Sequence, residues 1–202
     1  MLIPKFIKTI ASRISANPDY RPGLAWVHVT PTHIEATDSF VAVRIKNPFT
    51  ESDAKKYPSG LKRILSNDSV MIHKDEIALI PFKTSKKYRH LNERAALVSN
   101  GEAGSASIEC YYPNNSKVKV TAQTINAKFP DIVQFMTPYA KREGYTETAV
   151  SAQKLIDALT VMRDAGYTEV RISSCPNKPM FIEPYNKVKD DDSIALVMGL
   201  KI

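Results

Sequence analysis

One order of elements, an amphipathic helix followed by strand-like runs, occurs three times along this chain of 202 residues. The predicted helices begin near residues 4, 81 and 151, so the repeats lie about 70–80 residues apart. The repeats share the order of their elements but too little sequence to establish a duplication. A helix that packs its apolar face on antiparallel strands is an α+β unit. The repetition therefore predicts an α+β fold built from three such units.

Three segments carry the helical signal. In residues 4–15 the apolar side chains recur at helical spacing, and a proline suits the first turn. Residues 82–94 follow a proline and are rich in lysine and arginine. Residues 152–165 have Ser151 as a candidate N-cap and are followed by Gly166, a residue that favours a helix end.

Strands are predicted where short apolar or alternating runs are bounded by turn residues. The predicted strands cover residues 24–29, 33–45 with a turn at 36–39, 69–72, 77–80, 95–99, 105–112, 116–124, 168–173, 179–184 and 194–200. Polar residues and prolines predict two connections, over 47–68 with a short helix near 61–65, and over 137–148.

The formal charge of +7 is concentrated in one segment. Residues 55–94 carry ten basic and four acidic side chains, a balance of +6. A concentrated basic region is typical of a protein that binds a polyanion, most often nucleic acid. A lysine-rich solvated loop would give the same count, so charge alone leaves both interpretations open.

Composition excludes several classes of protein. No apolar run reaches the roughly 18 residues that a membrane span needs. The N-terminal segment places Lys5, Lys8 and Arg13 among its apolar residues, unlike a signal peptide. We therefore expect a soluble, cytoplasmic protein with no membrane partner. Cys110 and Cys175 lie far apart and outside any CxxC pair, which favours free thiols over a disulfide or a metal role.

No group of residues supports an enzyme or a metal site. The four histidines are scattered without ligand spacing, and no glycine-rich phosphate loop, nucleophile elbow or Cys/His dyad is present in the sequence. Asp38 with Glu35 or Asp131 could form a carboxylate pair. Asp38 fits better as an acceptor of backbone hydrogen bonds in its turn. The sequence therefore predicts a non-enzymatic protein with no cofactor and no metal.

Four segments resemble the bacterial sliding clamp, the β subunit of the replicative DNA polymerase. They are NPDYRPGLAWVHV, IEATDSFVAVRI, NAKFPDIVQFMTP and KPMFIEPYNKVKDDDSIALVMGLKI, and they occur in the family's order among the predicted helices and strands. Each segment alone is a weak signal, whereas four in order are specific. The resemblance implies a DNA-clamp-like α+β fold.

The resemblance also implies a shortened form. The family has six units in three domains, and this chain has room for three. The correspondence gives a complete clamp-like domain over 1–131, a linker over 132–148, and over 149–202 a half domain that resembles the C-terminal part of the clamp, with no counterpart of the first domain. Ser39 stands where the family hairpin has glycine, and Gly199 where its C-terminus has proline. Four chains of three units would supply the twelve units of a family ring, through head-to-tail association.

Two functional surfaces follow from the resemblance. Basic helices would contact the phosphates of double-stranded DNA without reading bases, through Lys5, Lys8, Arg13, Lys83, Lys86, Lys87, Lys154 and Arg163. A hydrophobic groove near the end of the chain would bind DNA polymerase and clamp-loader peptides, lined by Leu24, Thr37, Ser39, Val41, Ala42, Pro138, Leu196, Val197, Met198, Gly199 and Leu200. The simpler interpretation makes the cations the solvated faces of surface helices, and makes Met198 and Leu200 plain core residues.

The predicted function is a non-enzymatic sliding clamp that holds DNA and tethers a polymerase. The alternative is a clamp-like monomeric binding module, an adaptor or competitor for clamp-binding peptides, that does not encircle DNA. An enzyme would require a bound metal or nucleotide, for which the sequence offers no residues.

Overall fold

The strands of the protein form one sheet. The computed structural model describes residues 1–58, 69–82, 94–99, 104–112, 116–125, 129–136, 149–174, 179–186 and 191–199. Within these residues eleven strands follow the order β1-β6-β7-β8-β5-β2-β3-β4-β11-β10-β9, all paired antiparallel. Their bounds are β1 Leu2–Pro4, β2 Trp26–Val29, β3 His33–Thr37, β4 Val41–Lys46, β5 Val70–His73, β6 Arg94–Ser99, β7 Ser105–Tyr111, β8 Lys117–Ile125, β9 Val170–Ser173, β10 Met180–Pro184 and β11 Ile194–Val197.

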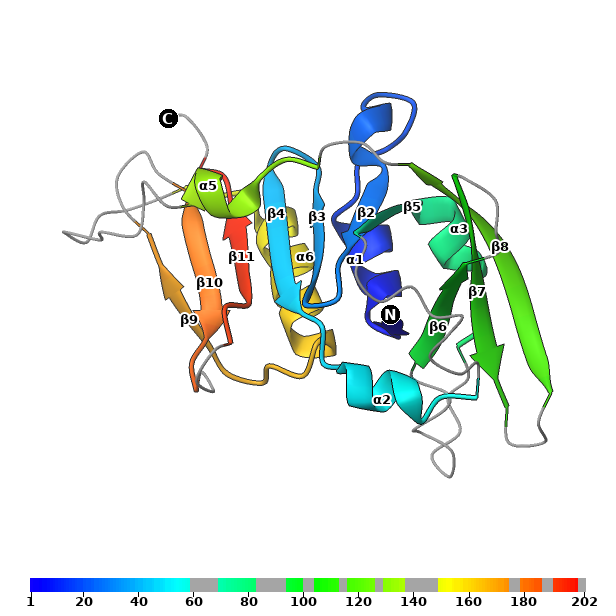
Figure 1. Cartoon of the computed structure of the whole chain (residues 1–202). Coiled ribbons are helices and arrows are strands. Elements are labelled where there is room, and N and C mark those ends of the chain that lie inside the picture. The colour runs from blue at the N-terminus through cyan, green and yellow to red at the C-terminus, as the bar shows by residue number, and fades with distance from the viewer. Residues whose placement is uncertain are drawn as a thin grey trace.

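The described helices lie on both faces of this sheet (Figure 1). They are α1 Ile7–Arg13, the 3₁₀ turn η1 Pro22–Leu24, α2 Glu51–Lys55, α3 Lys74–Leu79, α5 Ile132–Met136 and α6 Ala152–Asp164. Helices α1 and α6 cover one face, whereas α5 lies on the other face, in contact with β4. None of these helices has the length and apolar character needed to cross a membrane.

The main core lies between the sheet and helices α1, α3 and α6. Ile7 and Ile10 of α1 and Ile14 at its C-cap pack against inward-facing side chains of the strands, such as Val27 and Val43. Alternation along each strand places every second side chain in this core. Burial of branched aliphatic side chains contributes about 1.5–3 kcal/mol each, so this layer dominates the stability of the fold.

The helices and strands fall into repeated units, as predicted, but the helix of the second unit, α3, begins at Lys74 and not near residue 81. β1, α1, β2, β3 and β4 form the first unit, and β5, α3, β6, β7 and β8 form the second in the same order. The third unit has α6 followed by β9, β10 and β11. The first strands of the first two units are exchanged, because β1 pairs with β6 and β5 pairs with β2. The prediction of an α+β fold built from helix-plus-strands units is confirmed.

Three sequence predictions were wrong at the level of elements. Residues 77–80 belong to α3 and its C-cap and not to a strand, because the His73 ring nitrogen accepts from the Asp75 backbone N–H and two acidic residues occupy the first turn. Helix α1 begins at Ile7, later than the predicted residue 4, because Pro4 belongs to β1 and pairs with Arg94 of β6. Helix α2 lies in the predicted connection over 47–68 and was not predicted.

Other predicted elements agree with the structure or lie outside the described residues. The helix predicted over 152–165 is α6, with the Ser151 side chain accepting from the Lys154 backbone N–H at 3.4 Å. The predicted strands over 95–99, 105–112 and 116–124 are β6, β7 and β8. The short helix at 61–65, most of the basic helix at 82–94 and the polar connection at 137–148 lie outside the described residues.

Candidate functional site

Helices α1 and α6 lie side by side on the helix-covered face of the sheet. The Arg13 guanidinium contacts the Asp157 carboxylate at 3.3 Å, and the Thr9 hydroxyl donates to the Asp164 carboxylate at 2.7 Å. Both contacts join the first unit to the third. Five of the candidate DNA-binding cations therefore lie on two neighbouring helices. The α1 region carries Lys5, Lys8 and Arg13, and α6 carries Lys154 and Arg163.

Several of these cations already have protein partners. Arg13 pairs with Asp157, Lys154 with Asp38, and Arg163 with Asp164. The Lys8 ammonium donates to the Ala78 carbonyl at 2.8 Å. A carboxylate partner reduces the attraction that a cation offers to a phosphate. Lys83, Lys86 and Lys87 lie outside the described residues, so their place on this face stays a prediction.

An open pocket of about 620 Å³ lies at one end of these two helices. Lys5, Lys8 and Thr9 line it from the α1 side, Asp164 from the end of α6, and Phe49 from the chain after β4. Two lysines line this hollow together with one carboxylate, that of Asp164, so the lining has only a small positive balance of charge.

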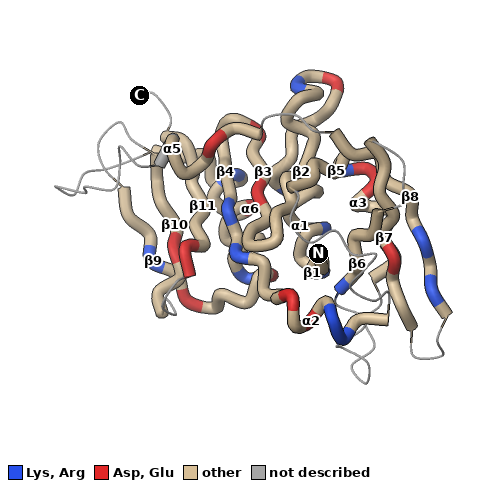
Figure 2. Tube along the Cα trace, viewed as in Figure 1, with Lys and Arg blue, Asp and Glu red and all other residues tan. Residues whose placement is uncertain are grey.

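Basic side chains also occur away from these helices. Figure 2 shows Lys and Arg along β4 and β8 as well as on α2. On β8, Lys117 pairs with the buried Glu109 at 3.0 Å, and Lys119 is exposed. The helix face is therefore one basic surface among several in the described part of the chain.

The turn between β3 and β4 is organised by Asp38. Its Oδ1 accepts backbone hydrogen bonds from Phe40 N at 2.9 Å and Val41 N at 2.8 Å, as predicted for a turn residue. Ser39 has a φ of +79°, the left-handed conformation that favours glycine. The Arg21 side chain donates to the Ser39 hydroxyl and lies 5.3 Å from the centre of the Phe40 ring. The turn and the segment before β2 therefore meet at one end of the sheet.

The terminal strand β11 completes the sheet beside β4. Leu196 pairs with Ala42, Val197 pairs with Val41, and the Met198 N–H donates to the Phe40 carbonyl at 2.8 Å. Val197 faces the main core, whereas Leu196 lies on the opposite face in a cluster with Phe181. Adjacent side chains of a strand point to opposite faces, so both faces of β11 are covered by apolar contacts.

Part of the predicted groove lining is brought together on the outer face of the sheet. Ala42 and Met198 pack, partly exposed, against the cluster of Leu196, Phe181 and Ile194. Ala42 also contacts the neighbouring cluster of Met71, Phe129 and Ile132, whose partly buried members include Trp26. Ala42 therefore lies between two apolar clusters of the outer face.

The remaining groove candidates have different surroundings. Val41 and Val197 are buried in the main core, and the Thr37 hydroxyl, also buried, donates to the Val41 carbonyl at 2.9 Å. Leu24 and Gly199 are half-buried, and Gly199 pairs with Val150. Pro138 and Leu200 lie outside the described residues.

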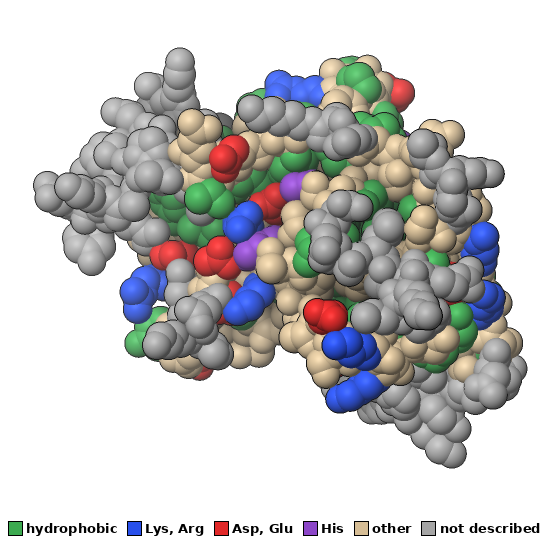
Figure 3. All heavy atoms as spheres, in the orientation of Figure 1, with side chains coloured by type: hydrophobic (Ala, Val, Ile, Leu, Met, Phe, Trp, Pro, Cys, Tyr) green, Lys and Arg blue, Asp and Glu red, His purple; other side chains and the backbone are tan. Residues whose placement is uncertain are grey.

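A polar network occupies the outer face over β2, β3 and β4 (Figure 3). Glu35 contacts His28 at 2.7 Å and pairs with Arg44, and Asp192 contacts His33 at 2.5 Å and Arg44 at 3.4 Å. Burial raises the pKa of the Glu35 carboxyl, but the hydrogen bonds and charges of His28 and Arg44 outweigh burial and hold that pKa below its usual value. The same balance, with His33 and Arg44 as partners, lowers the pKa of Asp192.

Comparison with solved structures identifies the architecture. A DNA polymerase sliding clamp from Pseudomonas aeruginosa matches over 100% of this chain and 66% of its own, with a TM-score of 0.60 and 15% sequence identity. The chain has the fold of a bacterial sliding clamp. The Helicobacter pylori beta clamp solved with 5-chloroisatin matches with a TM-score of 0.59 at 14% identity, over 100% of this chain and 65% of its own. The beta subunit of DNA polymerase from Streptococcus pyogenes matches with a TM-score of 0.52 at 11% identity, over 100% and 66%.

The similarity to clamps is clear from the structure and weak in the sequence. No protein-family model matches the chain, and none of the curated proteins matches it in sequence. The chain spans just under two thirds of the length of the clamps to which it is similar. At 11–15% sequence identity most side chains differ between this chain and these clamps, while the backbone fold is shared.

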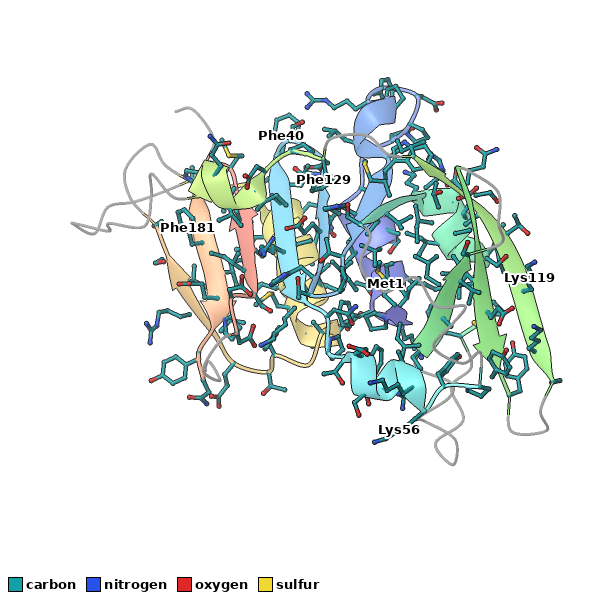
Figure 4. All side chains as sticks on the ribbon, in the orientation of Figure 1. Met1, Phe40, Lys56, Lys119, Phe129 and Phe181 are labelled. Atoms are coloured by element: carbon teal, nitrogen blue, oxygen red, sulfur yellow. The ribbon has the colours of Figure 1, made fainter. Side chains whose placement is uncertain are left out.

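Exposed aromatic residues of this clamp fold were missed by the sequence predictions. The Phe40 side chain is 55% exposed at the tip of the β3–β4 turn (Figure 4), and Tyr20 is 84% exposed shortly before η1. Large exposed apolar side chains that gather on one surface often mark a contact site. The available signal was an aromatic residue directly after the tight turn at Asp38 and Ser39.

Proposed function

We propose that this protein is a non-enzymatic DNA sliding clamp, a processivity factor that holds duplex DNA along α1 and α6 and tethers a polymerase through the outer face of β11. The observation that carries the proposal is the match of the whole chain to proteins named as DNA polymerase sliding clamps and polymerase β subunits. The fold supplies a rigid scaffold. The proposed role requires the protein to bind DNA and a polymerase peptide but not to catalyse a reaction.

The helix face suits weak contact with phosphates. Lys5 and Lys8 border an open pocket, and the Arg13 side chain is 48% exposed beside its carboxylate partner. Contacts made by lysine and arginine to phosphates are salt-dependent and independent of sequence. A protein that slides needs many such contacts, each too weak to fix it at one place.

The outer face of β11 suits an apolar peptide. Ala42 and Met198 are partly exposed beside buried Leu196, and methionine adapts its shape to different apolar side chains. The ring of Phe40, exposed at the neighbouring turn, can contact the same peptide. The partner proposed here is a short peptide of a polymerase or clamp loader with one or two large apolar side chains.

The helix face is tested by charge reversal. We expect the double variant Lys5→Glu and Lys8→Glu to weaken binding to a duplex of about 30 base pairs, because two cations near the phosphates become anions. Fluorescence anisotropy across a salt series measures this, and the slope of log K against log salt should fall by about 1 for each phosphate that the variant no longer neutralises.

Lys119→Glu is the matched control. Lys119 is exposed on β8 with its side chain on the sheet face opposite the helices, since its neighbours Val120 and Ala122 point to the core. The proposal predicts that this reversal leaves the slope unchanged. Equal reductions for both variants would mean that DNA binds through overall charge and not through the helix face.

The groove is tested by Met198→Glu. An apolar surface that gains a carboxylate should bind an apolar polymerase peptide at least about tenfold more weakly, measured by calorimetric titration. Val118→Glu on β8, another partly exposed apolar position, is the control. Unchanged affinity for the Met198 variant would remove this surface from the proposal.

The alternative function is a monomeric clamp-like module that binds the same peptides without encircling DNA. The carboxylate partners of Arg13, Lys154 and Arg163 favour it, because they reduce the charge left for phosphates. Retention on DNA separates the two functions. An encircling clamp stays on a closed circular plasmid in high salt and is released after one restriction cut, whereas a module shows no difference between circular and linear DNA.

A further inference from the structure

The third unit ends the sheet at β9, a strand with one neighbour among the described strands. Among the described residues β9 is the last strand, paired with β10 only (at one end of the sheet in Figure 1). The Tyr185 N–H donates to the Glu169 carbonyl at 3.0 Å. Because hydrogen bonding alternates along an antiparallel pair, the backbone groups of Val170 and Ile172 point away from β10, toward the open edge.

The equivalent strands of the other two units are covered. The strand after the helix is β2 in the first unit and β6 in the second, and each is paired with the first strand of the other unit. The core-facing side chains of β2 and β6, such as Val27 and Leu97, are 0% exposed. Ile172 has the same position in β9 and pairs with buried Ile182, yet it is 47% exposed.

Helix α6 also has apolar side chains that the described residues of the third unit do not fully cover. Ala158, Val161 and Met162 are fully buried against the sheet and α1. Leu155 and Leu159 remain partly exposed on the flank of α6 opposite Asp157, the residue that contacts α1. In helical geometry that flank faces the β9 end of the sheet. The apolar side chains on this flank of α6 are therefore only partly covered by the described residues.

The segment that would cover β9 is identified by the pairing of β5. In the second unit β5 contacts two strands, its own unit's last strand through Met71 and Ile125, and the first unit's β2. In the third unit Val150 precedes α6 and pairs with Gly199, just beyond its own unit's last strand. Val150 therefore lies where a first strand lies, with the side that should face another unit's β9 still unused by the described strands.

Within one chain Val150 cannot meet β9. Val150 lies next to the end of β11, and β10 separates β11 from β9. A second copy of the chain offers the same two surfaces. We infer that two chains associate through their third units, with the segment at Val150 of each chain pairing with β9 of the other, so that two half domains form one complete domain.

Such a contact is isologous. Each chain contributes the same patch, so association about this two-fold axis uses both open edges at once and closes. The contact would cover the outward backbone groups of β9 and the apolar side chains Leu155, Leu159 and Ile172, which is the usual way to protect an exposed edge. The inference depends on the fold and the strand pairing, and not on DNA binding.

The test is the mass of the protein in solution. Light scattering coupled to a sizing column, over a concentration series up to about 200 µM, should show a species of twice the chain mass of 22.6 kDa. Ile172→Lys places a charge in the apolar contact, and Ile172→Pro removes the outward N–H without affecting the bonds to β10. Both variants should raise the dissociation constant at least about tenfold.

Leu79→Lys is the matched control. Leu79 is a more exposed apolar residue on α3, in the second unit, and its substitution should leave the mass unchanged. Circular dichroism and the midpoint of thermal unfolding at low concentration establish that each variant is folded. A wild-type protein that stays at one chain, an assembly with an odd number of chains, or a dimer unaffected by both Ile172 variants would overturn the inference.

Discussion

Ser39 adopts a backbone conformation that its side chain disfavours. Its φ of +79° is the one positive value that a residue other than glycine has in the described part of the chain. A Cβ in the left-handed region costs about 1–2 kcal/mol. The surrounding contacts hold it there, because Asp38 accepts two backbone hydrogen bonds and the Ser39 N–H donates to the Thr37 hydroxyl at 3.1 Å.

We predict that Ser39→Gly increases the free energy of unfolding by about 1 kcal/mol. Glycine removes the strained Cβ and gives up only the exposed hydrogen bond from Arg21. Urea denaturation measures the change. Ser39→Ala keeps the Cβ and removes the hydroxyl, so it should not be more stable than the wild type. If the glycine and alanine variants have equal stability, the strain is not stored at this position.

The sequence predicted much of the local structure of this turn and none of its tertiary contacts. The resemblance placed Ser39 at a glycine position, and the chemistry of aspartate placed Asp38 on the turn amides. The contacts of Asp38 with Lys154 and of Ser39 with Arg21 join residues far apart in the chain. Periodicity and turn propensity act over a few residues, so they hold no information about such partners.

At the scale of elements, α1 and α6 are joined by a partly buried ion pair. Asp157 is only 6% exposed and also accepts from the Gln153 amide at 3.0 Å, whereas the Arg13 side chain is half exposed. Solvent screens a half-exposed partner, which limits the energy of the pair. The pair is still specific, because it joins the first described helix to the last described helix.

A double-mutant cycle measures that connection. We predict that Arg13→Ala and Asp157→Ala have a coupling free energy of about 0.5–1 kcal/mol in denaturant unfolding. The control cycle uses Glu51 and Lys55, two exposed residues within α2 whose 3.1 Å contact joins no two elements. The control should give a coupling near zero. Equal couplings in both cycles would mean that the contact between α1 and α6 adds nothing to the docking of the third unit.

Sequence patterns predicted α6 well and α3 badly for a physical reason. The segment 152–165 is long enough to show both an N-cap residue and the helical spacing of apolar side chains. Residues 77–80 are four apolar residues, and so short an apolar run fits a buried strand as well as a helix. The cap at His73 and the acidic first turn of α3 decide for the helix. Helix α2 was missed although Thr50 and Asp53 form a capping box.

At the scale of the whole molecule, the sheet joins the third unit to the first through β4 and β11. Four residue pairs, from Ile194 with Arg44 to Val197 with Val41, make this joint. Periodicity predicted both strands but could not predict their pairing, because strand order depends on which apolar faces meet in three dimensions. The resemblance to sliding clamps supplied the order of units, and the domain bounds 1–131, 132–148 and 149–202 stay a prediction.

The polar network strengthens the same joint. Arg44 on β4 pairs with Glu35 on β3 and with Asp192, which lies just before β11. Both carboxyls have a pKa below the usual value, of 4.5 for Glu35 and 3.8 for Asp192. A depressed pKa means that the folded state binds its proton less readily than the unfolded state does. The stability that these carboxylates contribute is therefore fully present above pH 4.5 and is lost as the pH falls through the lower, folded-state pKa.

We predict that acid weakens the joint between the first and third units. The free energy of unfolding, from urea titrations between about pH 7 and about pH 3, should be level near neutrality and fall below pH 4.5. Glu35→Gln should lower stability at neutral pH by about 2 kcal/mol, since the buried hydrogen bond from Arg44 loses its negatively charged acceptor, and should flatten the acid slope. Glu51→Gln, at an exposed carboxylate of α2, should leave the slope as it is. A Glu35 variant with the wild-type acid slope would assign the decrease in stability to other carboxylates, and the network would then contribute no pH dependence to the joint.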